Sequence, residues 1–460
     1  MKVFGSSGTR GVANEELTPG FVLRVAKAAG TAWGSGADGG AECIALARDT
    51  RYTGRMLADA AASGLASTGT DVDRLGIVPT PGAQAYAERE GVPVMVITAS
   101  HNPPQYNGVK LVGPNGVELS VATLEGIEEI LLTESFAVAP WDETGRVREV
   151  EGVRRAYVDQ LLEAVDRENI ADADLTVALD PGHGAGALTS PDFFRELGCR
   201  VVTVNGQADG HFPGRDPEPV PDNLEDLGRL VRATDADVGI AHDGDADRAI
   251  FFDENGEYVE GDATLAALAA AELEADDVTV SAVNVSQRLV DVVTEVGADL
   301  ELTPIGSTNI ITRIQELAAN GERIPIAGEG NGGVFFPEYR LSRDGAYTAA
   351  RFLELVAERP ASEVVAPYGG YANVRRNVEY ESTAERDAML DAAANQANTS
   401  DAELNTRDGY RLDYGDAWVL ARPSGTEPLV RIYAEAREAD RAEELAGDMC
   451  DALTEAKVNA

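Results

Sequence analysis

Lysine, cysteine and long apolar runs are scarce in this chain of 460 residues. The four lysines are Lys2, Lys27, Lys110 and Lys457. The three cysteines are Cys43, Cys199 and Cys450. Their number is odd and their spacing scattered, which excludes a zinc-binding pattern or a disulfide framework, so we expect free thiols. No run of 18 apolar residues occurs and no apolar segment precedes Phe4, so we expect neither a membrane partner nor a secretion signal.

Positive charge is also scarce relative to negative charge. The chain has 38 basic and 79 acidic residues, a net charge of −41. A chain of this charge, without a basic stripe, is a poor partner for nucleic acid. The acidic residues lie within apolar-periodic segments, which argues against a disordered tail. We expect a folded cytoplasmic protein working in concentrated salt, where the Debye length is about 3 Å at 1 M. In this respect it resembles the surfaces of haloarchaeal cytoplasmic proteins.

Apolar strands and helical segments alternate along most of the chain. This alternation predicts α/β domains with helices on both faces of a mostly parallel sheet. The pattern starts three times, and a region of different character follows a Pro- and Gly-containing stretch. We therefore expect three similar mixed α/β domains and a smaller C-terminal α+β domain around a central cleft. The expected boundaries are 1–150, 151–252, 253–366 and 367–460.

Several elements of this pattern have predicted positions. We expect a helix near residues 18–32, with Thr18 as its cap and Pro19 at its first position. We also expect strands at 75–78 and 324–327 and a turn at 306–309.

A serine stands where one of the predicted strands ends. Val94–Ile97 is a short apolar run, typical of a buried parallel strand. Pro103 and Pro104 follow soon after, and proline stops a strand because it lacks an amide donor. Ser100 is therefore expected on a stiff loop at the carboxyl end of a strand, where open α/β sheets bind ligands. It is the candidate nucleophile.

Three alternating aspartates follow another predicted strand, at 237–241. Asp243, Asp245 and Asp247 can converge on one hard cation, since oxygen ligands suit Mg²⁺ or Ca²⁺. A solvated acidic turn is the simpler alternative. An EF-hand loop is excluded because Arg248 stands where that loop needs glycine. Mg²⁺ binds well to a few carboxylates and a phosphate oxygen, which a phosphorylated Ser100 would supply.

Four further residues near these loops are candidates for handling phosphate and protons. Arg10 ends a Gly- and Ser-rich stretch that can face an oxyanion, although a flexible terminus explains it as well. Arg248 can stabilise charge in phosphoryl transfer. Lys110 is either a surface lysine or an acid–base group whose pKa shifts when it is desolvated near other cations. His101, beside Ser100, is the strongest functional candidate among the four histidines.

A second set of polar residues lies in the C-terminal half. The segment Arg422–Pro428 combines an arginine, two hydroxyls and a glycine, which suits a phosphate that does not react. A plain turn is the alternative. On the glycine-rich stretch 328–333, two residues can bond sugar hydroxyls, or cap a helix. The candidate binding residues are Arg422, Ser424, Gly425, Thr426, Arg431, Glu329 and Asn331.

Five motifs together resemble the α-D-phosphohexomutases. They are TASHNP at 98–103, NGVK at 107–110, DGDADR at 243–248, GEGNGG at 328–333 and RPSGTEP at 422–428. The superfamily includes phosphoglucomutase, phosphomannomutase and phosphoglucosamine mutase. The resemblance implies that Ser100 is a phosphoserine that exchanges its phosphoryl group with the substrate through a bound hexose 1,6-bisphosphate.

The same resemblance assigns the other site residues. It implies that Asp243, Asp245 and Asp247 hold one Mg²⁺ per chain together with Ser100, and that Arg248 contacts the phosphate. Lys110, assisted by Arg10 and His101, would handle protons. The residues at 422–431 would bind the distal phosphate, while Glu329 and Asn331 would read sugar hydroxyls.

The substrate stays open at this point. Asn331-Gly332-Gly333 and Pro304 depart from the pattern of many bacterial members, so glucose, mannose and glucosamine phosphates remain candidates. A phosphatase using the same serine and metal, and a non-catalytic sugar-phosphate binding protein, are the alternative functions. A homo-oligomer is possible.

Overall fold

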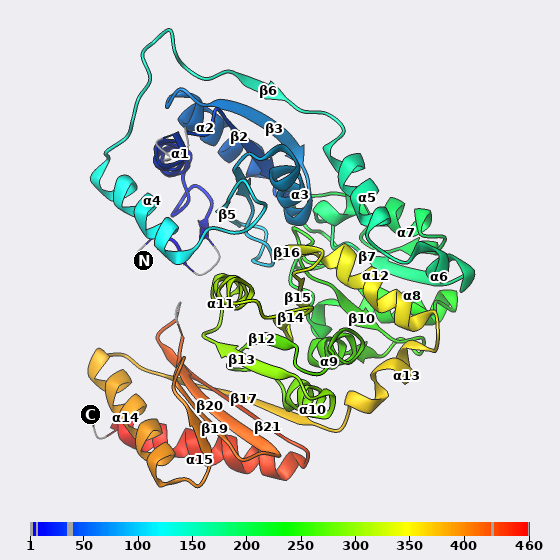
Figure 1. Cartoon of the computed structure of the whole chain (residues 1–460). Helices are drawn as coiled ribbons and strands as arrows, with labels where there is room; N and C mark the ends of the chain where they lie inside the picture. Colours follow the sequence, from blue (N-terminus) through cyan, green and yellow to red (C-terminus); the bar gives the residue numbers. More distant parts are fainter. Residues whose placement is uncertain (1–2, 6–7, 35–39, 425–426, 459) are drawn as a thin grey trace. The chain divides into compact units, whose positions relative to one another are not determined.

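The computed structural model describes residues 3–5, 8–34, 40–424, 427–458 and 460. Figure 1 shows the helices and strands in chain order. The chain divides into two compact units, each described here by itself. The first comprises Met1–Thr264 and Asn331–Val365, and the second comprises Leu265–Gly330 and Ala366–Ala460.

The first unit begins with a six-stranded sheet. Its strands are β1 (Thr9–Val12), β2 (Cys43–Arg48), β3 (Asp71–Ile77), β4 (Val94–Ile97), β5 (Tyr106–Val112) and β6 (Val147–Glu149). They lie in the order β1-β5-β4-β2-β3-β6. Parallel pairing joins β4, β2, β3 and β6, whereas β5 runs antiparallel to both β4 and β1. The carboxyl ends of β2 and β4 therefore meet at one edge.

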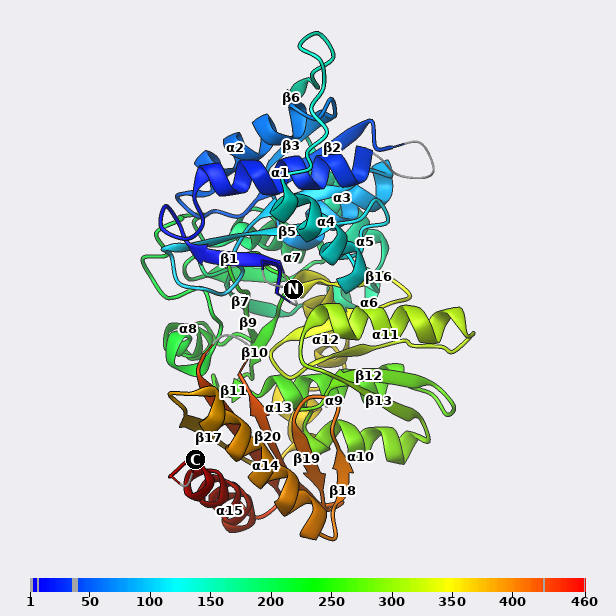
Figure 2. The same ribbon diagram turned by 90° about the vertical axis from the view of Figure 1, so that its left-hand side faces the viewer.

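Alternate residues of β2 face opposite layers of helices. The helices are α1 (Pro19–Gly34), α2 (Gly54–Ala66), α3 (Thr80–Glu90) and α4 (Val121–Thr133). Ile44 and Leu46 pack with α1, α2 and α4, while Ala45 and Ala47 pack with α3. This period of two is what a strand buried on both faces requires. Figure 2 shows α1 and α2 on the same side of this sheet.

A second sheet in the first unit repeats the plan with five strands. They are β7 (Thr176–Asp180), β8 (Arg200–Thr203), β9 (Val238–Ala241), β10 (Ile250–Phe252) and β11 (Tyr258–Val259). The order is β11-β10-β9-β7-β8, with β7 parallel to β8 and β9, and β10 antiparallel to β9 and β11. Its helical segments are α5 (Val153–Glu163), α6 (Arg167–Asp172), η1 (Ala185–Leu188), α7 (Ser190–Glu196), η2 (Pro221–Asn223) and α8 (Glu225–Thr234).

An antiparallel strand pair and two helices complete the first unit. They are β15 (Gly333–Phe336), β16 (Arg340–Arg343), α12 (Gly345–Val356) and α13 (Ala361–Val365). The helix α9 (Gly261–Glu272) contains the point at which the chain passes from the first unit to the second.

The second unit combines parallel strands with an antiparallel sheet. In its first part β12 (Val278–Ala282) pairs in parallel with β13 (Asp299–Thr303) and β14 (Ala327–Glu329). Its helical segments are α10 (Gln287–Val296), α11 (Ser307–Ala319), η3 (Ala366–Tyr368), α14 (Thr383–Thr399) and α15 (Ala439–Val458). The antiparallel strands are β17 (Ala372–Glu379), β18 (Glu403–Asn405), β19 (Tyr410–Asp413), β20 (Ala417–Pro423) and β21 (Leu429–Ala436). The helices α14 and α15 bury one face of this sheet.

Three predicted elements differ from the structure, and each difference has a local cause. The strand expected at 75–78 is the end of a longer strand, β3 (Asp71–Ile77), because Asp71, Asp73 and Arg74 interrupt the apolar run that indicates a buried strand. The strand expected at 324–327 begins only at Ala327, because Pro325 cannot donate to a strand ladder. The turn expected at 306–309 is the first turn of α11, which follows Gly306 at φ 126°. Ser, Thr and Asn are frequent both in turns and at helix starts, so composition alone does not separate the two. Across the described residues, no helix has the length and apolarity to span a membrane.

Candidate active site

The serine loop leaves the end of β4 in the centre of the first sheet. Ser100 is 1% exposed and has φ 50°, a left-handed conformation that is rare for a residue with a side chain. Its Oγ donates to Oδ2 of Asp243 at 2.6 Å and lies 3.3 Å from Nδ1 of His101. The backbone thus aims the serine hydroxyl at the aspartate loop, as the sequence predicts.

The aspartate loop leaves the end of β9 in the second sheet. One carboxylate oxygen of each of Asp243, Asp245 and Asp247 lies within 4.8 Å of the others, and all three residues are buried. Among the described residues, none donates a hydrogen bond to Oδ1 of Asp245 or Asp247. Burial and the two neighbouring carboxylates raise the pKa of Asp243 well above its usual value. Buried acceptors without donors and mutual repulsion are what a divalent cation relieves, so the site fits one.

Lys110 lies in this cluster rather than on the surface. Its Nζ is 3.2 Å from Oδ2 of Asp247, 3.3 Å from Oε1 of Glu118 and 3.8 Å from Oδ2 of Asp245. Burial lowers the pKa of Lys110, but these carboxylates outweigh it and the pKa is raised. The charge of Arg343 also lowers the pKa of Lys110, as expected for a desolvated lysine near another cation, but the surrounding acids have the larger effect.

Arginines form the rest of the charged surroundings. Arg10 lies on β1 opposite Gly108, and its Nη1 donates to Oδ1 of Asn102 at 2.8 Å. Nε of Arg248 lies 3.9 Å from Oδ1 of Asp247. The charge of Arg248, then burial and the charge of Arg10, hold the pKa of His101 far below its usual value, so its imidazole is neutral. This concentration of positive charge contrasts with the net charge of −41.

Three residues that sequence reasoning missed contact this cluster. Nη2 of Arg343 donates to Oδ2 of Asp247 at 2.6 Å. The hydroxyl of Thr80 donates to Oδ2 of Asp245 at 2.6 Å, and its amide donates to the Asp245 carbonyl at 3.0 Å. Glu118 is the third. Thr80 follows β3 and begins α3, so a polar residue at a strand's carboxyl end was an available signal; Arg343 and Glu118 carried none.

The segment 331–333 lies against the end of the aspartate loop within the first unit. The amide of Ala249 donates to the carbonyl of Gly332 at 3.1 Å. Oδ1 of Asn331 accepts from the amide of Gly333 at 3.0 Å, which folds this turn on itself. The predicted Asn331 therefore belongs to the same unit as Ser100, whereas Glu329, at the end of β14, belongs to the second unit.

The remaining predicted residues lie at the adjacent ends of β20 and β21 in the second unit. Arg422 and Arg431 are directly opposite across the ladder, where like charges are unfavourable. Nε of Arg422 pairs with Oδ2 of Asp408 at 3.1 Å, and Nη2 of Arg431 pairs with Oε2 of Glu427 at 2.6 Å. Oγ of Ser424 accepts from the amide of Glu427 at 3.3 Å. The predicted Gly425 and Thr426 lie outside the described residues.

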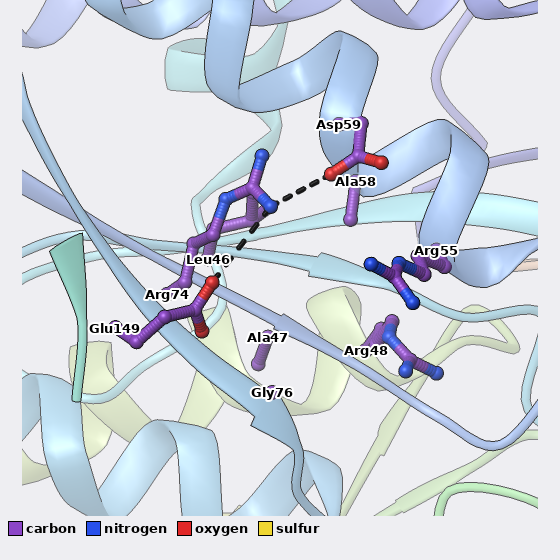
Figure 3. Close-up of a pocket in the computed structure, with 9 residues that line it drawn as sticks. All are labelled: Leu46, Ala47, Arg48, Arg55, Ala58, Asp59, Arg74, Gly76 and Glu149. Carbon is purple, nitrogen blue, oxygen red and sulfur yellow. Dashed lines mark hydrogen bonds and ion pairs between the residues drawn. The ribbon is translucent and has the colours of Figure 1, made fainter. Parts of the chain in front are cut away.

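A separate cavity of about 210 Å³ lies between α2, β2 and β3 (Figure 3). Arg74 pairs there with Asp59 at 2.7 Å and Glu149 at 3.9 Å, and Arg48 and Arg55 line the same cavity. Its lining contains none of the residues predicted from the motifs. We therefore treat it as separate from the serine site.

Comparisons with known proteins agree with this geometry. Family models described as phosphoglucomutase/phosphomannomutase alpha/beta/alpha domains I, II and III match residues 1–138, 155–256 and 260–370, and the model of the C-terminal domain matches 373–452. These matches confirm the predicted fold class of three α/β domains and a smaller α+β domain.

Individual relatives cover nearly the whole chain. The "Phosphoglucomutase/phosphomannomutase" of Thermococcus kodakarensis is 42% identical, with 96% of each chain covered. The "Probable phosphoglucosamine mutase" of Methanopyrus kandleri is 39% identical over 98% of this chain and 97% of its own. A crystal structure of a phosphoglucomutase/phosphomannomutase family protein from Burkholderia thailandensis has a TM-score of 0.87 and 28% identity, covering 100% of this chain and 98% of its own. The chain therefore belongs to the phosphoglucomutase/phosphomannomutase family of the α-D-phosphohexomutase superfamily.

Proposed function

We propose that the protein is a Mg²⁺-dependent phosphohexose mutase that interconverts hexose or hexosamine 1-phosphates and 6-phosphates. The observation that carries this proposal is the 2.6 Å contact between Oγ of Ser100 and Oδ2 of Asp243. A hydroxyl bonded to one of three clustered, buried carboxylates suits phosphoryl transfer, which needs mainly positioning and charge stabilisation. The names of the relatives support the same reaction.

Asp243, Asp245 and Asp247 are the residues that would hold one Mg²⁺, together with an oxygen of phosphorylated Ser100. The bound cation would neutralise negative charge on the transferring phosphoryl group. A magnesium ion is named in the complex of the Aspergillus fumigatus N-acetylphosphoglucosamine mutase, a chain of the same fold at 16% identity.

The protein's own residues then divide the work. In the first transfer the bond between phosphorus and Oγ of Ser100 breaks and a new bond forms between phosphorus and a sugar hydroxyl oxygen. The sugar hydroxyl loses its proton, and Oγ of Ser100 gains one. The resulting hexose 1,6-bisphosphate turns over in the site and transfers its other phosphoryl group to Oγ of Ser100. In this second transfer Oγ loses its proton and the released sugar oxygen gains one, which balances the exchange. Lys110, with Arg10 and His101, handles these protons. Arg248 binds the phosphate at the serine.

The substrate-binding roles follow from chemistry that suits a sugar phosphate. Glu329 and Asn331 would bond the sugar hydroxyls. The two arginines that face each other across β20 and β21 would bind the phosphate that does not react, since an anion relieves the repulsion between them. The residues in this phosphate-binding set are Arg422, Ser424, Gly425, Thr426 and Arg431.

The sugar, the compartment and the domain boundaries belong to this proposal too. The named relatives include both a phosphoglucomutase/phosphomannomutase and a phosphoglucosamine mutase, so glucose, mannose and glucosamine phosphates are all candidates. The net charge supports an enzyme of a salt-rich cytoplasm. We place the domain boundaries after residues 150, 252 and 366.

Replacing the serine tests the proposal. Each of the three sugar 1-phosphates is supplied in high salt with a trace of hexose 1,6-bisphosphate, and both the 6-phosphate formed and the free phosphate released are measured. Ser100→Ala is expected to lose isomer formation almost completely, because no nucleophile remains. Ser63→Ala, a change on the exposed face of α2, is the matched control and is expected to keep full activity.

Two outcomes would replace the mutase with its alternatives. Free phosphate release by the wild-type protein without any 6-phosphate would make it a phosphatase. Sugar-phosphate binding without turnover, unchanged in Ser100→Ala, would make it a binding protein.

A further inference from the structure

A buried arginine outside the predicted site donates hydrogen bonds to the backbone of the serine loop. Arg51 is 1% exposed, and its guanidinium donates to four backbone carbonyls of the segment 100–106. Nη2 donates to the carbonyls of Ser100 at 2.8 Å and Asn102 at 2.6 Å. Nη1 donates to those of Pro103 at 2.7 Å and Tyr106 at 3.0 Å. One side chain therefore bonds both ends and the middle of the loop that carries the nucleophile.

An aspartate at the end of β2 fixes the orientation of this arginine. Oδ2 of Asp49 accepts from Nε of Arg51 at 3.0 Å, and Oδ1 accepts from the Arg51 amide at 2.9 Å. Oδ2 of Asp49 also accepts from the hydroxyl of Thr98 at 2.8 Å. The same hydroxyl oxygen of Thr98 accepts from the amide of Ser100 at 2.9 Å. Because β2 and β4 are parallel neighbours, this carboxylate holds Ser100 through both its amide and its carbonyl.

The serine loop needs such support from outside. Pro103 and Pro104 have no amide hydrogen, and the amides of Asn102 and Tyr106 donate to the carbonyls of Ala99 and Pro103. Among the described residues, no backbone amide outside regular helices and strands donates to the carbonyls of Ser100 and Asn102, which Arg51 bonds. A buried carbonyl without a donor is unfavourable, and the planar guanidinium offers five donors in a fixed fork. The φ of 50° at Ser100 is strained and persists only when neighbouring contacts over-determine it. The ring of Phe212, 5.3 Å from the guanidinium carbon, packs against Arg51.

We propose that Arg51 is a positioning residue for phosphoryl transfer: it holds Ser100 in the left-handed conformation that directs Oγ to Asp243. This inference rests on the proposed mutase function. All guanidinium nitrogens of Arg51 are engaged by the protein itself, so it is not a substrate ligand. Its loss should affect the transfer step and spare sugar-phosphate binding, since displacement of a reacting atom by about 1 Å can lower the rate about 10²-fold.

The test compares Arg51→Met and Arg51→Lys with a matched change in the second unit. Arg411 is also buried, donates to the carbonyls of Val283 and Val285, and stacks on Trp418 at 4.2 Å. Arg411→Met therefore removes an equally buried guanidinium that belongs to the other unit. For each protein, kcat, KM, the melting temperature and the rate of phosphoryl transfer from hexose 1,6-bisphosphate to Ser100, followed by intact mass, are measured.

Arg51→Met is expected to lower kcat and the transfer rate together by about 10²-fold, with KM within about threefold of wild type. Arg51→Lys, which keeps a charge beside Asp49 but loses the fork, should lose at least about tenfold. Arg411→Met should lower the melting temperature while the folded protein keeps its kcat. A wild-type kcat in folded Arg51→Lys, or an equal loss in Arg411→Met, overturns the proposal.

A second measurement does not depend on activity. Amide hydrogen exchange of the segment 98–106 should accelerate in Arg51→Lys and stay unchanged in Arg411→Met, because the loop loses its donors only in the first variant. Unchanged exchange in Arg51→Lys contradicts the positioning role whether or not Arg51→Met folds. A wild-type protein that forms no isomer would instead refute the mutase function, while the exchange result would still decide the role of Arg51 in holding the loop.

Discussion

The first two sheets each support a functional loop with a buried aspartate–arginine pair, but the number of hydrogen bonds from the arginine to that loop differs. In each sheet a central strand (β2 or β7) pairs in parallel with a neighbour (β4 or β9), and an antiparallel strand lies beyond that neighbour. The proposed catalytic or metal-binding residues lie on the loop that follows the neighbour in the chain. In each, an aspartate at the end of the central strand pairs with a buried arginine. Asp49 pairs with Arg51 at 3.0 Å, and Asp180 pairs with Arg215 at 2.9 Å.

The two arginines differ in where they direct their donors. Arg51 gives four hydrogen bonds to the serine loop. Arg215 comes from the proline-rich segment 212–221 and gives its 2.6 Å bond to the carbonyl of His242, beside the aspartates. Its Nη1 bonds the carbonyls of its own segment, at Asp216 and Pro217. A nucleophile needs one fixed direction, whereas carboxylates that share a cation, as we propose for the second loop, would also be held by it. The second loop would then need less support from the protein.

Among the variants that test this comparison, one that removes a carboxylate from the aspartate loop should lose the most activity. Asp243→Asn keeps a group that can bond Oγ of Ser100 but removes one negative charge from the cation site. We expect kcat to fall by about 10³-fold and the Mg²⁺ requirement to rise, because charge stabilisation dominates such reactions. The measurement is the rate of isomer formation against Mg²⁺ concentration. Asp222→Asn, at an exposed position of the same domain, should change neither; wild-type kinetics in Asp243→Asn would contradict the metal assignment.

Replacing Arg215 should separate the two loops. Arg215→Met is expected to raise the Mg²⁺ concentration for half-maximal activity by about tenfold, because the carbonyl of His242 loses its donor and the aspartate loop its support. At saturating Mg²⁺, kcat should recover to within about tenfold of wild type, unlike in Arg51→Met. Mg²⁺ titrations of both variants make the comparison, and an unrecovered 10²-fold loss in Arg215→Met would mean that the two loops are braced alike.

The smallest expected effect concerns two thiols: Cys43, which begins β2 in the first sheet, and Cys199, which directly precedes β8 in the second. Burial, with the nearby Asp73, raises the pKa of Cys43 to about 11, and burial, with Asp237, raises the pKa of Cys199 to about 12. A raised thiol pKa lowers the thiolate fraction at a given pH, and Cys199 is also the more buried of the two thiols. At pH 8 it should therefore be alkylated more slowly than Cys43. Peptide mapping after iodoacetamide treatment in a Cys450→Ser background measures this.

Reactivity should increase as the pH rises and become equal after denaturation. Faster alkylation of Cys199 than of Cys43 in the folded protein would contradict the order given by burial.

Local sequence predicted the parts of this molecule that depend on neighbours along the chain. The strand Val94–Ile97 has its predicted bounds, and the serine and aspartate loops follow their strands as expected. The features that the local sequence did not predict depend on tertiary contacts. The surroundings of Lys110 are set by Glu118 and by aspartates more than a hundred residues away, and nothing near Arg343 in the sequence indicates that it reaches Asp247. Arg51 stands in a polar stretch whose partners are defined only once β2 and β4 pair.

The near-complete burial of Ser100 has a consequence for how long the enzyme would stay phosphorylated. Hydrolysis of a phosphate ester on Ser100 requires water to attack the phosphorus, and the buried residues around Oγ limit the directions from which water can approach. A phosphorylated enzyme would therefore lose its phosphoryl group slowly between substrate encounters. Besides that slow loss, only the rare escape of a bisphosphorylated sugar would discharge it. A trace of hexose 1,6-bisphosphate would then be enough to keep nearly all enzyme molecules phosphorylated at Ser100.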